Sequence, residues 1–237
     1  AGPGDKVDLL FPRPQRILMD TVFSTGKPVI LVNMCGSAMD LREADEKAAA
    51  ILQAWYPGAR GGKDVADIIF GNVSPSGKLP LTFYESSDDL PDIKDYSMKN
   101  RTYRYFEGTP LYPFGFGLTY SDCCVNAMSV DKAEGEFDGV NVTVSVKNNG
   151  SVDTEEVVQV YIKDEEFELA VRNFSLCGFK RISLKAGEEK TVTVKIDKRA
   201  FTSVDADGNR KIFSKKFTLF AALSQPDSRS EELTGHK

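Results

Sequence analysis

Two stretches of strictly alternating residues place the strongest limit on the fold of the C-terminal half of the chain. Residues 140–146 read VNVTVSV and residues 191–196 read TVTVKI, so valine or isoleucine occupies every second position. A period of two places these side chains on one face of a strand and the polar side chains on the other. A strand with only one apolar face must pack that face against a second layer. The pattern therefore predicts sheets that pack face to face.

The rest of this half has the same character. Further strands are expected at residues 157–162, 177–184 and 217–223, and turn residues stand at 148–150, 185–188 and 205–209. Short strands with turn signals at such spacing are typical of an antiparallel, immunoglobulin-like sandwich. We therefore predict an all-β sandwich over residues 121–237.

Residues 1–95 alternate instead between helix-like and strand-like segments. Ile17, Leu18 and Val22 would share one face of a first helix, and the almost continuously apolar residues 28–34 predict a strand buried on both sides. Helix formers at 43–54, a short strand at 52–56 and a helix at 63–70 follow. Strand, helix, strand and helix predict a layered α/β sheet, and so few strands predict that the sheet is incomplete. Residues 96–120, rich in aromatic and arginine side chains, should form an extended segment that joins the halves and packs onto a surface.

Composition excludes several classes of function. The net charge is −5, and no Lys and Arg patch is dense enough for a nucleic-acid partner. No apolar run approaches the ~20 residues that cross a membrane. The only histidine is His236, the four cysteines lack metal-ligand spacing, and no phosphate-binding glycine motif occurs, so no metal or cofactor is expected. Reduced thiols favour the cytoplasm, with a periplasmic or secreted location as the alternative.

Three motifs resemble one family. Residues 54–62 read AWYPGARGG, residues 66–81 read ADIIFGNVSPSGKLPL, and residues 101–120 read RTYRYFEGTPLYPFGFGLTY. In this order they are similar to the C-terminal region of family 3 glycoside hydrolases, which include β-glucosidases and β-xylosidases. The second half resembles the fibronectin type III-like module of the same family. The resemblance thus covers nearly the whole chain.

This resemblance implies a retaining mechanism with two carboxyl groups. In the family the nucleophile is an Asp on an N-terminal (β/α)8 barrel, and in many members the acid/base is a Glu on a loop of the α/β domain. Residues 4–10 (GDKVDLL) resemble the segment just downstream of that Glu. We therefore expect no catalytic residue in this chain, inactivity of the chain alone, and the barrel portion of the same enzyme as its partner. The acidic pairs at 88–89, 155–156 and 165–166 are sequence neighbours that should point apart.

Arg101, Tyr103 and Tyr105 are the candidate substrate-binding residues. On an extended strand these three share one parity, so a forked donor and two rings would face a sugar while Phe106 faces the core. The alternative is that the tyrosines pack against the α/β half and the arginines pair with acids. Trp55 offers a similar choice between stacking on a sugar and packing in the core, which is favoured.

The resulting hypothesis is a non-catalytic C-terminal portion, or subunit, of a retaining exo-β-glycosidase that acts on plant-type oligosaccharides. The sequence RTYRYF at 101–106 resembles the β-xylosidase-like branch more than typical β-glucosidases. The alternative is a stand-alone carbohydrate-binding or structural interaction module.

Overall fold

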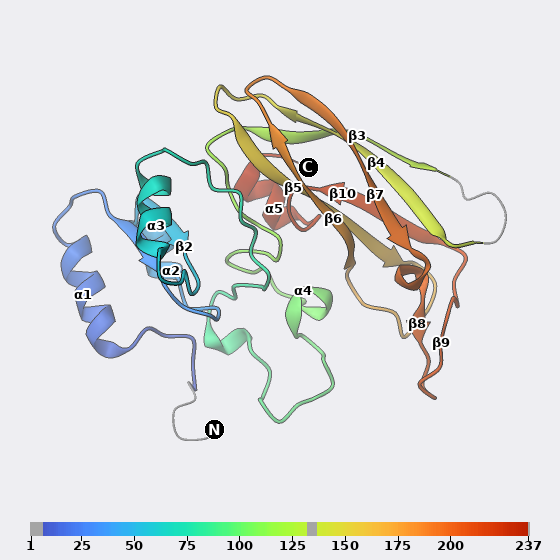
Figure 1. Ribbon diagram of the computed structural model, residues 1–237. Helices are drawn as coiled ribbons and strands as arrows, with labels where there is room; N and C mark the ends of the chain where they lie inside the picture. The colour runs from blue at the N-terminus through green and yellow to red at the C-terminus, as the bar shows by residue number, and fades with distance from the viewer. Residues whose placement is uncertain (1–6, 132–136, 237) are drawn as a thin grey trace.

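The computed structural model describes residues 7–131 and 137–236 and consists of a small α/β part beside a β-sandwich (Figure 1). Residues 4–6, which belong to the segment that resembles the region after the acid/base Glu, lie outside the described residues. The connecting segment runs between the two parts and contacts both.

The α/β part contains helix α1 (Arg13–Phe23), strand β1 (Ile30–Asn33), helix α2 (Arg42–Lys47), strand β2 (Ala50–Gln53) and helix α3 (Gly61–Ile69). Strands β1 and β2 are parallel, with Ile30 opposite Ala50 and Asn33 opposite Gln53. The predicted order of strand, helix, strand and helix is confirmed. Parallel pairing also means that both strands end at the same edge of the sheet.

Two expectations for this part were wrong. The helix formers at 43–54 do not continue one helix, because α2 ends at Lys47 and β2 then pairs with β1. The strand predicted to be buried on both sides is largely accessible, since Ile30 is 46% exposed and only Asn33 is buried. The apolar face of α1 is equally uncovered among the described residues, with Leu18 62% exposed.

The sandwich consists, in the part of the chain that is described, of two three-stranded antiparallel sheets with the orders β10-β5-β6 and β3-β4-β7. The strands are β3 (Cys123–Asp131), β4 (Gly139–Asn148), β5 (Thr154–Asp164), β6 (Ser175–Leu184), β7 (Glu189–Asp197) and β10 (Phe217–Ala222). Val144 of β4 pairs with Val192 of β7, and both are buried. The alternating residues face the core as predicted.

Other elements of this half are a turn of 3-10 helix η2 (Lys198–Phe201), the hairpin β8 (Ser203–Val204) and β9 (Arg210–Lys211), and helix α5 (Ser228–Thr234). The turn expected at 205–209 closes this hairpin. Helix α5 was not predicted, although its capping residues are present. The Asp227 carboxylate accepts the N–H of Ser230 at 2.8 Å, and Gly235 ends the helix with a φ of 73°.

The connecting segment is partly extended and partly turned. Phe83 pairs with Tyr112 as an isolated bridge, and the N–H of Leu79 donates to the carbonyl of Phe116 at 2.8 Å. The turn of 3-10 helix η1 (Ser87–Asp89) precedes it, and the short helix α4 (Thr102–Tyr105) interrupts it. The predicted strand at residues 101–106 was therefore wrong, because Thr102 has a φ of 56°, which no strand residue adopts.

Two apolar clusters form the interior. The larger one lies between the sheets and includes Val142, Val160 and Ile196, whereas the smaller one joins the α/β part to the connecting segment through Leu41, Phe83 and Leu111. Polar contacts link the two parts, among them the hydroxyls of Ser74 and Thr154 at 2.7 Å.

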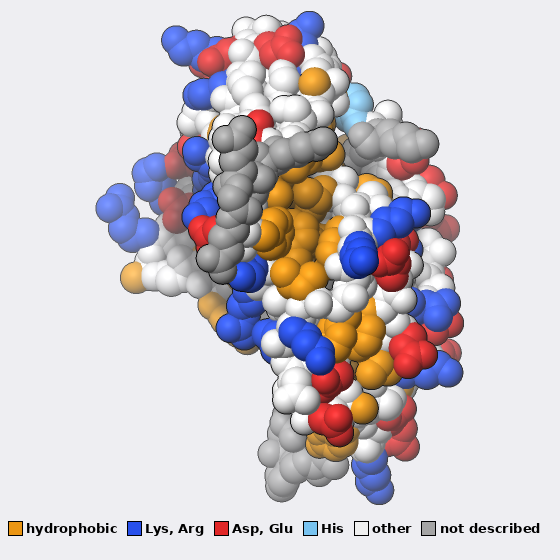
Figure 2. Space-filling view, turned by 90° about the vertical axis from the view of Figure 1, so that its right-hand side faces the viewer, with side chains coloured by type: hydrophobic (Ala, Val, Ile, Leu, Met, Phe, Trp, Pro, Cys, Tyr) orange, Lys and Arg blue, Asp and Glu red, His pale blue; other side chains and the backbone are white. Residues whose placement is uncertain are grey.

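Figure 2 shows the side of the molecule that lies at the right of Figure 1. Hydrophobic side chains gather in a hollow at its centre, and Lys and Arg side chains lie on both sides of it. Strands β3 and β10 are at the edges of their sheets, and Met128 and Val130 on β3 are each 40% exposed. Within the described residues, part of the apolar surface of the sandwich is therefore accessible.

Candidate functional site

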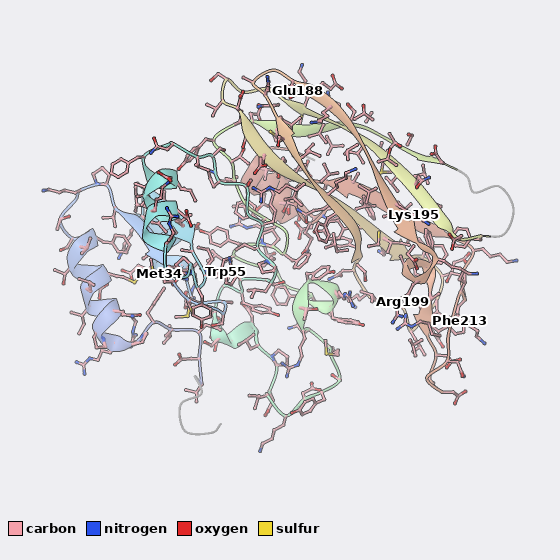
Figure 3. All side chains as sticks on the ribbon, in the orientation of Figure 1. Met34, Trp55, Glu188, Lys195, Arg199 and Phe213 are labelled. Atoms are coloured by element: carbon pink, nitrogen blue, oxygen red, sulfur yellow. The ribbon has the colours of Figure 1, made fainter. Side chains whose placement is uncertain are left out.

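The carboxyl ends of β1 and β2 form the first candidate site. Met34 and Trp55 follow these two strands and lie close together in Figure 3. At the same strand ends, the buried Asn33 amide donates to Gln53 Oε1 at 2.6 Å, and Gln53 Nε2 donates to the Cys35 carbonyl at 2.8 Å. Side-chain amides thus hold both loops at the strand ends. This edge is where ligands bind in open parallel sheets.

Trp55 belongs to the core of the α/β part. Its ring meets Phe83 edge to face, with 6.4 Å between the ring centroids, and it packs on the smaller apolar cluster. Its backbone has a φ of 54°, which is an outlier for a bulky residue. Such strain persists only where surrounding contacts hold it, and it concentrates at functional sites. The packing supports the core interpretation.

Tyr56 was not among the residues expected at a site. Its side chain is 81% exposed, beside the half-buried Trp55. A Cβ atom placed on Gly36 would lie 2.4 Å from Tyr56 Cε2, so the ring lies directly against the backbone of Gly36. Because Gly36 has no side chain, the Tyr56 ring can lie on the loop that follows β1, where it forms an accessible flat surface. Aromatic faces of this kind stack on apolar faces of ligands.

Arg101 binds backbone oxygens just before the connecting segment. Its guanidinium donates to the Asp92 carbonyl at 2.7 Å and to the Asp95 carbonyl at 2.8 and 3.1 Å. The alternative interpretation predicts a partnership with acidic side chains, but the acceptors are backbone oxygens. Arg101 thereby closes the loop of residues 92–101.

Tyr103 packs between the connecting segment and the sandwich. Its ring stacks on Phe114 with 4.1 Å between centroids and meets Tyr161 of β5 edge to face. Its hydroxyl accepts the N–H of Leu176 at 3.0 Å. The alternative of a packed tyrosine is favoured by these contacts, although the partner is the sandwich and not the α/β half.

Tyr105 has different surroundings. It is half-buried and, with Arg104, lines a hollow against the sandwich. The structure thus does not bring Arg101, Tyr103 and Tyr105 onto one face, and their binding of substrate stays a prediction. Phe106 is 7% exposed, as expected for a residue that faces the core.

The loop around these residues has an unusual backbone. Met98, Asn100 and Thr102 have φ values of 65°, 58° and 56°. The Glu107 N–H donates to Asn100 Oδ1 at 2.9 Å, and the Thr102 N–H donates to the Tyr84 hydroxyl at 3.0 Å. These hydrogen bonds hold left-handed residues that would each cost about 1–2 kcal/mol. The segment is therefore fixed in one conformation by contacts along its length.

Each of the three acidic pairs contains at least one carboxylate with a structural partner. Asp89 Oδ2 accepts the Ser86 N–H and thereby caps η1. Glu155 forms an ion pair with Arg181. Glu166 Oε2 accepts the Lys215 N–H at 2.7 Å. Glu156 pairs with Lys78 at 2.8 Å. Over the described ranges, no group of three or more His, Cys, Asp and Glu side chains could hold a metal ion. These carboxylates stabilise the fold and do not converge on one point.

Comparison with known proteins identifies the family. Residues 2–120 match the glycosyl hydrolase family 3 C-terminal domain, and residues 156–225 match a fibronectin type III-like domain. The chain therefore belongs to glycosyl hydrolase family 3, as the C-terminal region of that family followed by a fibronectin type III-like domain.

The relatives are longer proteins. A xylan 1,4-β-xylosidase from Xylanibacter ruminicola is 40% identical over 237 residues, which cover 98% of this chain and 27% of the relative. A periplasmic β-glucosidase from Salmonella typhimurium is 36% identical, with coverage of 92% and 30%. A β-glucosidase from Streptomyces venezuelae, solved with D-glucose, is 31% identical with a TM-score of 0.84, and the match covers 94% of this chain and 30% of that one. The chain thus spans less than a third of these proteins.

No helix in the described ranges is long and apolar enough to cross a membrane. One relative is named as periplasmic and another, from Dictyostelium discoideum, as lysosomal, so the relatives do not share a single stated location.

Proposed function

We propose that this chain is the non-catalytic C-terminal portion, or a separate subunit, of a retaining exo-β-glycosidase. The main support is the extent of the match with the Xylanibacter ruminicola β-xylosidase. The match includes 98% of this chain but only 27% of that enzyme, so most of the enzyme has no counterpart in this chain. The catalytic carboxyls would lie in the remaining part of the enzyme, on a (β/α)8 barrel and on a loop that precedes residues 4–10. The acidic neighbours of this chain already have structural partners, which supports that assignment.

The proposed role of the chain is to form one wall of the substrate site. Tyr56 offers an 81% exposed ring at the carboxyl edge of β1 and β2, and its position depends on Gly36. A sugar has apolar C–H faces that stack on such a ring. The rigid segment that carries Arg101, Tyr103 and Tyr105 is the second part of the proposed wall, with Tyr105 as the member that lines a hollow.

The proposed substrates are plant-type oligosaccharides, with β-xylosides favoured over β-glucosides. Two of the relatives are named as β-xylosidases, from Xylanibacter ruminicola at 40% identity and Formosa agariphila at 34%, and the Salmonella typhimurium β-glucosidase has 36%. The test is the ratio of kcat/KM for an aryl β-xyloside and the matching β-glucoside, measured on the complete enzyme. A ratio above one supports the preference, and a ratio below one contradicts it.

Three units are proposed: an α/β portion at 1–95, a connecting segment at 96–120 and the sandwich at 121–237. The larger apolar cluster draws its buried members from residue 123 onward, which supports a sandwich core of its own. A cytoplasmic location remains the proposal, with periplasmic or secreted as the alternative. The half-buried Cys177, whose thiol donates to the Val160 carbonyl at 3.2 Å, is compatible with a reduced state.

The intact mass of the native protein tests the proposed arrangement. A mass several times that of the chain, which is 26.1 kDa, would place the chain in a longer polypeptide. A native mass equal to that of the chain, without an associated catalytic subunit, would contradict the proposal and favour a stand-alone module.

A further inference from the structure

A hollow of about 780 Å³ lies where the connecting segment, the loop between β5 and β6, η2 and the β8–β9 hairpin meet. Arg199 lies at the end of the sandwich that carries this hairpin (Figure 3). The polar residues that line the hollow are Arg104, Tyr105, Ser175, Asp197, Arg199, Thr202, Ser203 and Arg210. Tyr105, which belongs to the second part of the proposed substrate wall, lines this hollow, whereas Tyr56 does not.

Three arginines converge on this hollow from separate elements, since Arg104 comes from α4, Arg199 from η2 and Arg210 from β9. In the described part of the chain none of them forms an ion pair. By contrast, Arg172 pairs with Glu107 and Arg181 with Glu155. The three arginines of the hollow thus differ from Arg172 and Arg181, which are paired with glutamates.

The hollow is electropositive. Its lining residues include three arginines and one acid, Asp197, which leaves an excess of two positive charges among them. Asp197 Oδ1 already accepts the backbone N–H of Arg199 at 2.7 Å, as the cap of η2. Arg210 uses one N–H toward the Thr202 hydroxyl at 3.2 Å, and Arg104 lies over the Tyr103 ring at 5.9 Å. Most of their donors therefore remain available for a ligand.

The chemistry of these groups defines a ligand. Guanidinium forks bind carboxylates through two parallel hydrogen bonds, which a lysine ammonium cannot reproduce. The half-buried Tyr105 ring and the hydroxyls of Ser175, Thr202 and Ser203 suit the faces and hydroxyl groups of a sugar. We propose that this hollow binds a sugar residue that carries a carboxylate, such as a uronic acid branch of a plant-type oligosaccharide. The anionic group follows from the arginines, whereas the sugar part rests on the proposed function.

The test is a binding titration of the 237-residue chain, followed by NMR chemical shifts at constant low ionic strength. The probes are D-glucuronate, neutral D-glucose and inorganic phosphate. We expect saturable binding of glucuronate that is at least tenfold tighter than binding of either other probe. Arg199→Ala and Arg210→Ala should each weaken glucuronate binding at least fivefold, and Arg210→Lys should also weaken it because the fork is lost. The matched control is Arg16→Ala on α1, an exposed arginine far from the hollow in sequence, which should change nothing.

Three results would overturn the site: equal binding of glucose and glucuronate, phosphate binding as tight as that of glucuronate, or unchanged binding in the two alanine variants. Because the arginines are exposed, these variants should fold as the parent chain does. The readout is binding and not turnover. Failure of the glycosidase assignment would therefore leave glucuronate binding intact, and loss of this site would leave the glycosidase assignment intact.

Discussion

Lys78 Nζ lies 2.8 Å from Glu156 Oε1, and the two side chains are only 10% and 4% exposed. Lys78 follows the turn of the α/β part at residues 75–77, and Glu156 belongs to β5 of the sandwich. The same ammonium donates to the Gly117 carbonyl at 2.7 Å. A buried, hydrogen-bonded ion pair therefore joins the two parts of the molecule.

Removing one partner of this pair should destabilise the fold strongly. Lys78→Met and Glu156→Leu should each lower the free energy of unfolding by roughly 3–5 kcal/mol, because each leaves an uncompensated buried charge. The double variant should be within about 1–2 kcal/mol of the parent, since neither charge remains. Urea denaturation measures all three, and Lys63→Met, which breaks an exposed pair with Asp67, is a control that should have little effect. Additive losses in the double variant would show that the two charges do not interact.

The same pair predicts a pH dependence. Burial raises the pKa of the Glu156 carboxyl above its ordinary value, although the Lys78 ammonium and the Val157 N–H act in the opposite direction. A folded pKa above the unfolded one means that the folded state binds the proton more tightly. The contribution of Glu156 to stability is then fully present below the unfolded pKa and is lost as the pH rises through the folded pKa.

Comparison with Glu156→Gln isolates this titration from that of other groups. The difference in free energy of unfolding, parent minus variant, should be larger at pH 4 than at pH 7. Urea denaturation at both pH values gives this difference. A difference that shrinks on acidification would show that Lys78 dominates and that the pKa is lowered.

The sandwich could be predicted from the sequence because its signal is local. Strands β4 and β7 bury every second residue, so alternation alone marks them. Strand β3 escaped prediction because only Cys123 of its nine residues is buried, and an exposed edge strand leaves no alternating pattern. In the α/β part, residues 50–53 carry helix formers yet form a strand. Pairing with β1 overrides the local preference there.

The candidate site depended on contacts that the sequence does not reveal. Trp55 and Tyr56 are adjacent aromatics, and only the fold shows that the first packs on Phe83 while the second lies on Gly36. The alternation of Arg and Tyr at 101–105 suggested a strand. The backbone forms a turn there instead, because Met98, Asn100 and Thr102 are left-handed. The Arg101 guanidinium also donates to the Asp92 carbonyl, which holds the turn in place.

Tyr103 should behave as a packing residue. Tyr103→Ala removes a ring stacked on Phe114 and should lower the free energy of unfolding by roughly 2–4 kcal/mol. Tyr103→Phe keeps the ring and loses only the hydrogen bond from Leu176, at about 1 kcal/mol. In the complete enzyme, both variants should keep kcat/KM close to that of the parent at temperatures where they are folded. A tenfold fall in kcat/KM with unchanged stability would show instead that the ring contacts the substrate, as the sequence predicted.

Tyr56 should show the opposite behaviour. Tyr56→Ala removes an exposed ring, so the melting temperature should hardly change, whereas kcat/KM of the complete enzyme should fall roughly fivefold or more through the loss of ~1 kcal/mol of stacking. Gly36→Ala should have a similar effect, because the new methyl group would displace the ring. Tyr96→Ala, at a tyrosine that is 88% exposed, is the matched control. Equal kcat/KM in Tyr56→Ala and Tyr96→Ala would remove Tyr56 from the substrate wall.

We propose that this chain supports glycoside hydrolysis without supplying the catalytic carboxyls. The most direct test of this proposal is the rate of hydrolysis of aryl β-xyloside and β-glucoside by the purified 237-residue chain, beside the complete enzyme at equal molar concentration. We predict no release of the aryl group above buffer for the chain and turnover for the complete enzyme, since general acid and nucleophile are both required. Turnover by the chain alone that survives repurification and follows the protein peak would show that the chain itself carries catalytic carboxyls.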